Sequence, residues 1–271
     1  MAGGPIVVQH PQFGPAMPSL NWIPMPRYVL RRDRVLSLLE STPPCKVLDI
    51  GCGPGALISE LSGRGFEAYG VDRSAKAREL GRHLKDQASR MQLHAVLDEA
   101  WKGSFDLVMS FEVIEHLKDD IGAIQEWAEY LKPGGRMILS TPAHPDRWNA
   151  ADEWAGHVRR YTRQQLVDTV EKAGFEVDKV ECYGFPLANV MEVIAAPGYR
   201  KRLESKRTAF DDADALTQDS GSDRSAYAKL WPIYSSFLPA LALKAFCELQ
   251  RPFLNSDLGT GYIISAVRRD S

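Results

Sequence analysis

The strongest constraint on the fold of this 271-residue chain is a glycine-rich turn, Gly51-Cys-Gly-Pro-Gly55, directly after the apolar run at residues 46–50. Glycine allows positive φ angles and a close approach of the backbone to a ligand, and the helix that follows offers unpaired N–H groups. Asp72 ends the next apolar run, about 20 residues further on, where a ribose-binding carboxylate is expected. The turn therefore predicts a strand, a turn and a helix that together bind a nucleotide-like ligand.

Short apolar runs alternate with helical patterns through the middle of the chain. We expect strands at residues 46–50, 67–71, 91–96, 105–110, 136–141, 175–183 and 259–269. We expect helices at residues 28–40, 55–64, 75–87, 112–131 and 163–173. Strands that alternate with helices imply right-handed crossovers, and so an α/β fold with a mostly parallel sheet and helices on both faces. Ligands bind such sheets at the carboxyl ends of the strands.

Composition divides the chain into three parts. Residues 1–44 hold a Pro- and Gly-rich arm and a helical pattern with a basic face, which we interpret as a lid. The α/β core covers residues 45–183 and 259–271. Residues 184–258 form an insertion, partly helical, before the last strand, and long insertions over a ligand face usually form pockets or lids. We expect it to pack over the substrate pocket, with a peripheral membrane contact through residues 229–254 as the alternative.

Charge and cysteine usage exclude several classes of protein. The 33 basic and 35 acidic residues give a net charge of -2, whereas a nucleic-acid-binding chain normally has a basic surplus. The four cysteines lack the spacing of a disulfide framework or a zinc site, and the N-terminus lacks the pattern of a signal peptide. We therefore expect a cytoplasmic protein with a small-molecule substrate and no nucleic-acid partner.

From the glycine turn onward, the chain resembles the class I S-adenosylmethionine-dependent methyltransferases. The resemblance rests on VLDIGCGPG (47–55), GVDRS (70–74), FDLVMSFEVIEHL (105–117) and LKPGGRMILSTP (131–142), in the family's usual order and spacing. It covers about residues 28–182 and the last strand, and implies a Rossmann-like seven-stranded sheet with S-adenosylmethionine as the cofactor. The cofactor contacts that it implies come from Asp49, Gly51, Cys52, Gly53, Asp72, Arg73, Asp98, Ser110 and Phe111.

The turn leaves one alternative open, a dinucleotide-dependent oxidoreductase. Its glycines are spaced GxGxG rather than GxGxxG, and Asp49 precedes the first glycine by two residues. Both features favour the sulfonium cofactor. Asp72 fits either ligand, because its two carboxylate oxygens can accept hydrogen bonds from two ribose hydroxyls.

Carboxylates and imidazoles follow the fourth predicted strand. Glu112 and Glu115 would share one face of a helix that begins there, with His116 beside them, and His157 lies in the loop between the fifth strand and the next helix. Such a set suits a divalent metal such as Mn, Fe, Co or Zn, and Mg less well. The four positions are similar to those that hold a metal in small-RNA 3′-terminal 2′-O-methyltransferases, and the ExxEH part is similar to ubiquinone-pathway O-methyltransferases.

His157, His116 and Glu112 are the candidate catalytic residues. Without a metal, an imidazole would act as general base, because it titrates near the working pH. With a metal, the ion would lower the pKa of the substrate hydroxyl. Both versions predict in-line O-methylation of a small molecule, apolar or lipid-like because the insertion is apolar, with RNA 2′-O-methylation as the alternative. We expect three arginines to be solvated rather than to bind an anionic group: Arg31, Arg159 and Arg160.

Overall fold

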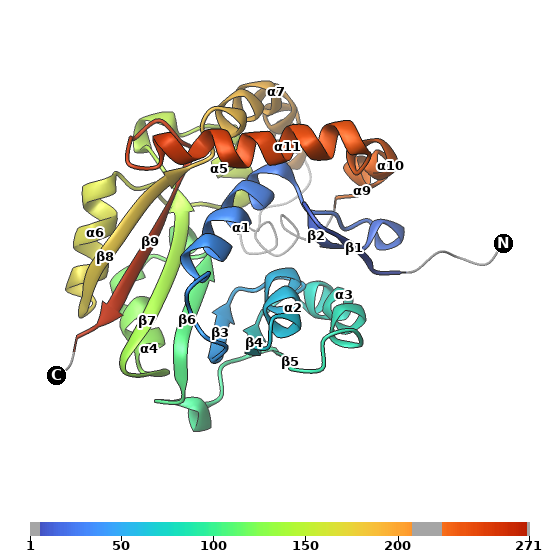
Figure 1. The fold of residues 1–271 in the computed structure, drawn as a ribbon. Coiled ribbons are helices and arrows are strands. Elements are labelled where there is room, and N and C mark those ends of the chain that lie inside the picture. The colour runs from blue at the N-terminus through green and yellow to red at the C-terminus, as the bar shows by residue number, and fades with distance from the viewer. Residues whose placement is uncertain (1–5, 208–223, 270–271) are drawn as a thin grey trace.

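A computed structural model describes residues 6–207 and 224–269, with a seven-stranded sheet between layers of helices (Figure 1). The strands are β3 (Lys46–Ile50), β4 (Glu67–Val71), β5 (Met91–His94), β6 (Phe105–Phe111), β7 (Leu131–Pro142), β8 (Phe175–Tyr183) and β9 (Gly261–Arg268). Their order is β5-β4-β3-β6-β7-β9-β8, and β9 alone runs antiparallel to the other six strands. The predicted α/β fold, Rossmann-like and mostly parallel, is confirmed.

Helices cover both faces of this sheet. Those around the core are α1 (Pro26–Leu38), α2 (Ala56–Gly63), α3 (Ala75–Lys85), α4 (Asp120–Ala128), α5 (Ala150–Ala155) and α6 (Arg163–Lys172). Neighbouring residues of β3 belong to different cores, because successive side chains of a strand point to opposite faces. Val47 packs with Leu30 and Leu61 of α1 and α2, whereas Leu48 packs with Ile124 and Leu166 of α4 and α6.

The helix predicted at residues 112–131 exists only over its middle part, Asp120–Ala128, and its predicted start is wrong. The chain instead forms a short 3-10 turn, η3 (Ile114–His116), and begins α4 only at Asp120. Asp119 caps that helix by accepting a hydrogen bond from the Gly122 amide at 2.9 Å. Glu112 lies before η3 with a φ of 58°, outside any helix. Glu112 and Glu115 therefore do not share a helix face.

The N-terminal arm is a small hairpin followed by α1. The hairpin strands are β1 (Val8–His10) and β2 (Gly14–Ala16), and β2 lies against α2. A 3-10 turn, η1 (Pro18–Leu20), follows them. Helix α1 begins at Pro26, where the missing N–H of proline costs nothing. The arm is anchored by Phe13 and Trp22, which are both buried.

The insertion is helical in its described part. It contains α7 (Leu187–Arg207), α9 (Ser225–Ala228), α10 (Trp231–Tyr234), α11 (Phe237–Gln250) and the 3-10 turn η5 (Arg251–Phe253). Helices α7 and α11 lie along the upper edge of the molecule in Figure 1, above the carboxyl ends of the central strands. Residues 208–223, which include most of its acidic segment, lie outside the described residues. Within the part of the chain that the structure describes, no helix is both long and apolar enough to cross a membrane.

Candidate active site

The glycine turn leaves the carboxyl end of β3 and folds back against β4. The amides of Gly51 and Cys52 both donate hydrogen bonds to the Val71 carbonyl, at 2.7 and 3.1 Å. Gly51 has a φ of 76°, and a Cβ there would lie 2.4 Å from Cγ2 of Val113. Gly53 has a φ of 57°, but a Cβ there would meet nothing within 4 Å. The turn thus packs tightly on the protein at Gly51 and presents open space at Gly53.

Asp72 stands at the end of β4 and faces this turn. One carboxylate oxygen accepts a hydrogen bond from the Gly53 amide and the other from the Ser74 amide, each at 2.8 Å. Ser74 in turn caps α3 by accepting from the Ala77 amide at 3.2 Å. A carboxylate oxygen has a second lone pair, so a fixed Asp72 can still accept from a ligand.

The residues beside the turn differ in burial. Asp49 is 3% exposed, one of its carboxylate oxygens has no hydrogen-bond partner, and burial raises its pKa to about 8. The Cys52 thiol contacts the Gly53 carbonyl at 3.5 Å, and burial raises its pKa well above the usual range, so it remains a thiol. Arg73 is exposed. The unpaired oxygen of Asp49 is an acceptor that a cationic ligand group would satisfy.

The other predicted cofactor contacts lie on both sides of the turn. Asp98 is exposed and caps the 3-10 turn η2 (Glu99–Trp101), accepting a hydrogen bond from the Ala100 amide at 3.0 Å. Ser110 is buried near the end of β6 and donates to the Ile50 carbonyl at 2.8 Å. Phe111 follows it, with the Arg31 guanidinium 5.5 Å from its ring centre. These residues line the carboxyl edge of the sheet, as the sequence predicts.

Glu112 is the centre of a partly buried charge network. Arg27 donates to one carboxylate oxygen at 2.9 Å, and Arg31 pairs with the other at 3.3 Å. The hydroxyls of Ser140 and Tyr183 also donate to it, at 2.9 and 3.2 Å. Burial alone would raise the pKa of Glu112, but the two guanidinium groups outweigh it and lower that pKa to about 2. The prediction that Arg31 is solvated is wrong, because its side chain is 15% exposed and pairs with Glu112.

Three of the four predicted metal-ligand residues converge: Glu115, His116 and His157. One potential ligand atom from each lies within 4.8 Å of the other two. Glu115 is fully buried, and one of its carboxylate oxygens accepts from the Thr141 hydroxyl at 3.4 Å. The other oxygen has no hydrogen-bond partner and lies 3.9 Å from Nε2 of His157. Burial, and then the charge of Glu112, raises the pKa of Glu115.

Both imidazoles are held through Nδ1. Nδ1 of His116 lies 3.2 Å from the Gly156 carbonyl, and Nδ1 of His157 lies 2.9 Å from a carboxylate oxygen of Asp152. A carbonyl and an ionised carboxylate only accept, so each Nδ1 carries the proton and each Nε2 keeps a free lone pair. Metal-ligating histidines are typically fixed in this way, and so are histidines that accept a proton from substrate.

Asp152 is held by a buried arginine that the sequence analysis expected to be solvated. Arg160 is 6% exposed and donates to both carboxylate oxygens of Asp152 at 2.7 Å. Burial would raise the pKa of Asp152, but the hydrogen bonds from His157 and Arg160 lower it to about 2. Arg159 is also paired, with Asp120 at 2.9 Å. Both arginines bind side chains of this protein, and the prediction of solvated arginines is wrong.

Sequence reasoning missed the residues that orient this cluster. Asp152 lies five positions before His157 and forms a capping box with Asn149 at the start of α5. That local pattern was a readable signal for a helix start, although not for the hydrogen bond to His157. Arg27 and Tyr183 gave no local signal, because their contacts join segments far apart in the chain.

The comparisons with known proteins agree with this geometry. A family of methyltransferase domains matches residues 25–180. The ubiquinone biosynthesis O-methyltransferase of Thiobacillus denitrificans is 37% identical over 101 residues, which are 35% of this chain and 44% of that protein. That of Sodalis glossinidius is 31% identical over 140 residues, 48% of this chain and 55% of that protein. The chain thus spans about half the length of these curated relatives.

Two solved structures show the same fold. Phosphoethanolamine N-methyltransferase 2 of Haemonchus contortus, in complex with S-adenosyl-L-methionine, has a TM-score of 0.52 at 20% identity, over 89% of this chain and 53% of that one. The [4+2]-cyclase SpnF has a TM-score of 0.57 at 17% identity, over 100% of this chain and 91% of that one. A cyclase shares the fold, so the fold alone does not decide the reaction. The family match to residues 25–180 decides against a dinucleotide oxidoreductase.

Proposed function

The chain belongs to the methyltransferase-domain family, and on that premise we propose that it transfers a methyl group from S-adenosylmethionine to a hydroxyl of a small, apolar molecule. The observation that carries this proposal is the position of two groups at one edge of the sheet. The glycine turn and Asp72 lie at the ends of β3 and β4, and the cluster of Glu115, His116 and His157 lies beyond β6.

The cofactor half of the site fits S-adenosylmethionine. The open space at Gly53 admits a ligand against the backbone, and Asp72 has lone pairs free for ribose hydroxyls. The unpaired oxygen of Asp49 suits the cationic amino group of the methionine part. We also assign cofactor contacts to five further predicted residues: Cys52, Arg73, Asp98, Ser110 and Phe111.

The reacting half supplies a base and holds the acceptor in line. In the proposed step the substrate oxygen attacks the methyl carbon, the carbon–sulfur bond breaks, and its electron pair stays on the thioether sulfur. Nε2 of His157 or of His116 takes the hydroxyl proton, since both atoms keep a free lone pair. Burial, and then the neighbouring His157, lowers the pKa of His116, which keeps that ring neutral. Correct positioning supplies much of the rate of such a displacement.

A divalent metal is the second version of this proposal. The unpaired oxygen of Glu115 and the Nε2 atoms of His116 and His157 form a donor set that fits Mn, Fe, Co or Zn, and Mg less well. When bound, such an ion lowers the pKa of a hydroxyl. Glu112 is committed to two arginines, so we assign it to holding Arg27 and Arg31 at the site. Metal analysis, with activity measured before and after a chelator, separates the two versions.

Calorimetry with S-adenosylhomocysteine tests the cofactor assignment. We expect Asp72→Ala to weaken binding by about tenfold or more, because a hydrogen bond to a charged group contributes about 1.5–3 kcal/mol. His157→Ala should leave that affinity nearly unchanged and abolish transfer of labelled methyl to a small-molecule extract. Tight binding of NAD, with no heat from S-adenosylhomocysteine, would contradict the proposal.

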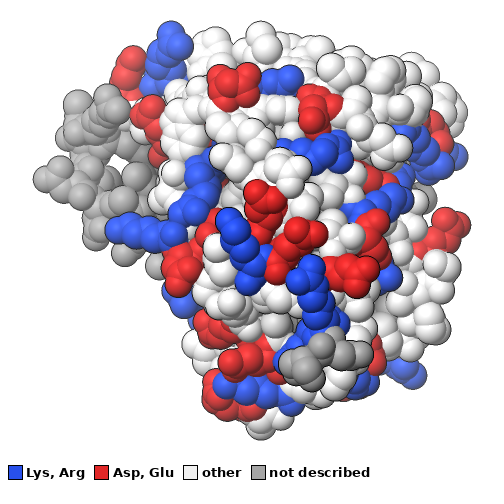
Figure 2. Space-filling view, turned by 90° about the vertical axis from the view of Figure 1, so that its left-hand side faces the viewer, with Lys and Arg blue, Asp and Glu red and all other residues white. Residues whose placement is uncertain are grey.

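The surface above the site favours an apolar or lipid-like acceptor and a peripheral membrane contact. Large apolar side chains are exposed on and around α10 and α11, among them Ile233 at 68%, Phe237 at 76% and Leu238 at 72%. Lys229 and Lys244 are exposed beside them. By contrast, the face drawn in Figure 2, which is seen from the left-hand side of Figure 1, carries acidic and basic side chains side by side. An apolar surface with nearby lysines suits an anionic lipid surface.

Sedimentation with vesicles tests this contact. We expect Phe237→Ser with Leu238→Ser to lower the fraction bound to phosphatidylglycerol vesicles. The matched control is Val96→Ser, because Val96 is 69% exposed and lies far along the chain from α11. Equal binding by all three proteins, or self-association of the wild type in place of vesicle binding, would contradict a lipid contact.

A further inference from the structure

We propose that Glu192, on the first helix of the insertion, is a positioning residue that fixes the orientation of His157. The inference rests on the proposed function in one respect, that His157 is the reacting imidazole or a metal ligand. Glu192 does not touch the three residues that converge at the reacting end. It acts through Arg160 and Asp152, which lie between α7 and His157.

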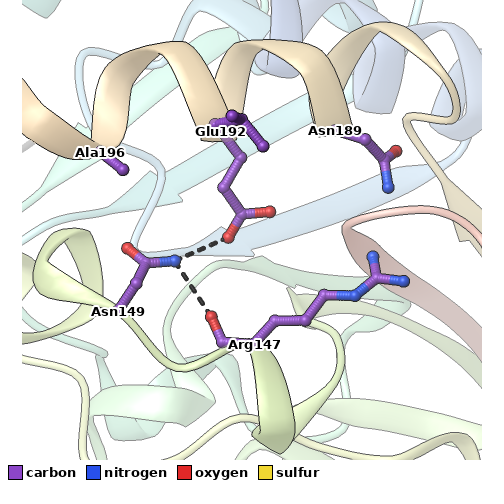
Figure 3. A pocket seen from close by; sticks show the side chains of 6 residues that line it. Arg147, Asn149, Asn189, Glu192 and Ala196 are labelled. Carbon is purple, nitrogen blue, oxygen red and sulfur yellow. Dashed lines mark hydrogen bonds between the residues drawn. The ribbon is translucent and has the colours of Figure 1, made fainter.

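The outer end of this chain of contacts is a single carboxylate oxygen of Glu192. It accepts a hydrogen bond from Arg160 at 2.7 Å. It also accepts one from the side-chain amide of Asn149 at 2.9 Å (Figure 3). The same amide also donates to the Arg147 carbonyl at 3.0 Å. Glu192 therefore joins α7 both to the start of α5 and to the arginine that holds Asp152.

The inner part of this series of contacts is rigid because Arg160 and Asp152 are buried and are joined by two hydrogen bonds. Arg160 meets Asp152 through two parallel hydrogen bonds, and the side chains of these residues are 3% and 1% exposed. Such a bidentate pair has one favoured geometry. The oxygen of Asp152 that accepts from Arg160 Nε also accepts from Nδ1 of His157. A shift of the guanidinium therefore moves the acceptor that sets the ring's orientation and tautomer.

Glu192 lies beside a pocket, and its hydrogen bonds reach from α7 to the loop on the other side. A pocket of about 380 Å³ separates α7 from the 3-10 turn η4 (Pro145–Arg147) and the start of α5. Its walls are Arg147, Asn149, Asn189, Glu192, Val193 and Ala196 (Figure 3). Across this pocket, the hydrogen bonds of Glu192 join α7 to the loop. The seating of the insertion and the orientation of His157 are thus set by the same carboxylate.

Three variants of the full chain separate positioning from simple support. Glu192→Ala removes the acceptor, whereas Glu192→Gln keeps an oxygen that Arg160 and Asn149 can still reach. Glu204→Ala is the matched control, since Glu204 is an exposed residue of the same helix. The readout is nitrogen-15 NMR of the His157 ring, which reports the tautomer and the exchange of the Nδ1 proton and needs no methyl transfer.

We expect the wild type, Glu192→Gln and Glu204→Ala to show one tautomer, with a protected proton on Nδ1. Glu192→Ala should show mixed tautomers and fast exchange of that proton. Any enzymatic turnover should fall about 10- to 100-fold in kcat, the usual effect of losing such a support, with unchanged affinity for S-adenosylhomocysteine.

A folded Glu192→Ala protein with the wild-type ring spectrum would overturn the proposal. If that variant does not fold, Glu192→Asp replaces it, because its side chain is one methylene too short to reach Arg160 without moving α7. A wild-type spectrum in that protein would equally overturn the proposal. If the wild type binds no S-adenosylhomocysteine but Glu192→Ala shows these ring changes, the proposed function is contradicted and the positioning role of Glu192 is not.

Discussion

Backbone groups form most of the site around the glycine turn, whereas buried side chains from distant segments form the site around His157. At the turn, the key hydrogen bonds join Gly53 and Ser74 to Asp72, over at most 19 residues of chain. Around His157, Arg160 reaches Glu192 across 32 residues, and Arg27 reaches Glu112 across 85. The first arrangement depends on the backbone conformation of the glycines, whereas the second depends on matched charges.

The largest expected effect comes from removing the buried cation Arg160 from the site around His157. We expect Arg160→Ala to lower the free energy of unfolding by about 3–5 kcal/mol, because it leaves the buried charge of Asp152 without its partner. Lys132→Ala is the control, since its pair with Asp106 is exposed and should cost at most about 1 kcal/mol. Urea denaturation measures both, and equal effects would contradict the contrast.

The pH dependence of stability distinguishes the two regions through their carboxylates. The pKa of Asp49 is raised to about 8 by burial, so the folded protein holds a proton that the unfolded chain releases. Stability from this group is present below its unfolded pKa and is lost as pH rises toward 8, by at most about 1.4 kcal/mol per pH unit. We expect the free energy of unfolding of Asp49→Asn to fall less between pH 5 and pH 8 than that of the wild type. Urea denaturation at each pH measures it.

Glu112 should act in the opposite direction. Its pKa is lowered to about 2, so its stabilising effect is present above the unfolded pKa and is lost as pH falls through about 2. We therefore expect Glu112→Gln to be less stable than the wild type near neutral pH and to lose little more stability in acid. A Glu112→Gln protein with the acid sensitivity of the wild type would show that the arginine pairs do not control this carboxylate.

The smallest expected effect lies in the turn itself. Gly53→Ala should cost about 1–2 kcal/mol of stability, because alanine at a positive φ is strained although its Cβ would meet no neighbour. Gly51→Ala should cost more, since its Cβ would also overlap Val113, and Val113→Ala in the same chain should restore part of the loss. Calorimetry should show weaker S-adenosylhomocysteine binding in Gly53→Ala, because the new methyl group occupies the open space.

Elements whose structure is determined locally follow most closely from the sequence. The strand, turn and helix at residues 46–64 follow from an apolar run, the glycines and a helical pattern within one short segment. The strands near residues 67, 105 and 175 were also predicted within a few residues. The predicted helix start failed at residues 112–119, where tertiary contacts override the helical pattern. Glu112 adopts a positive φ there and accepts hydrogen bonds from Arg27, Ser140 and Tyr183 on other elements.

The amino-acid sequence by itself determined the α/β fold, the order of its elements, the glycine turn and the carboxylate that faces it. These features depend on backbone preferences and apolar periodicity, which act over a few residues. Only the tertiary structure decided that Glu115, His116 and His157 converge without Glu112, and that Arg160 joins Asp152 to Glu192 rather than to solvent. A buried charge pairs with whichever opposite charge the folded chain brings beside it, and sequence spacing carries no record of that partner.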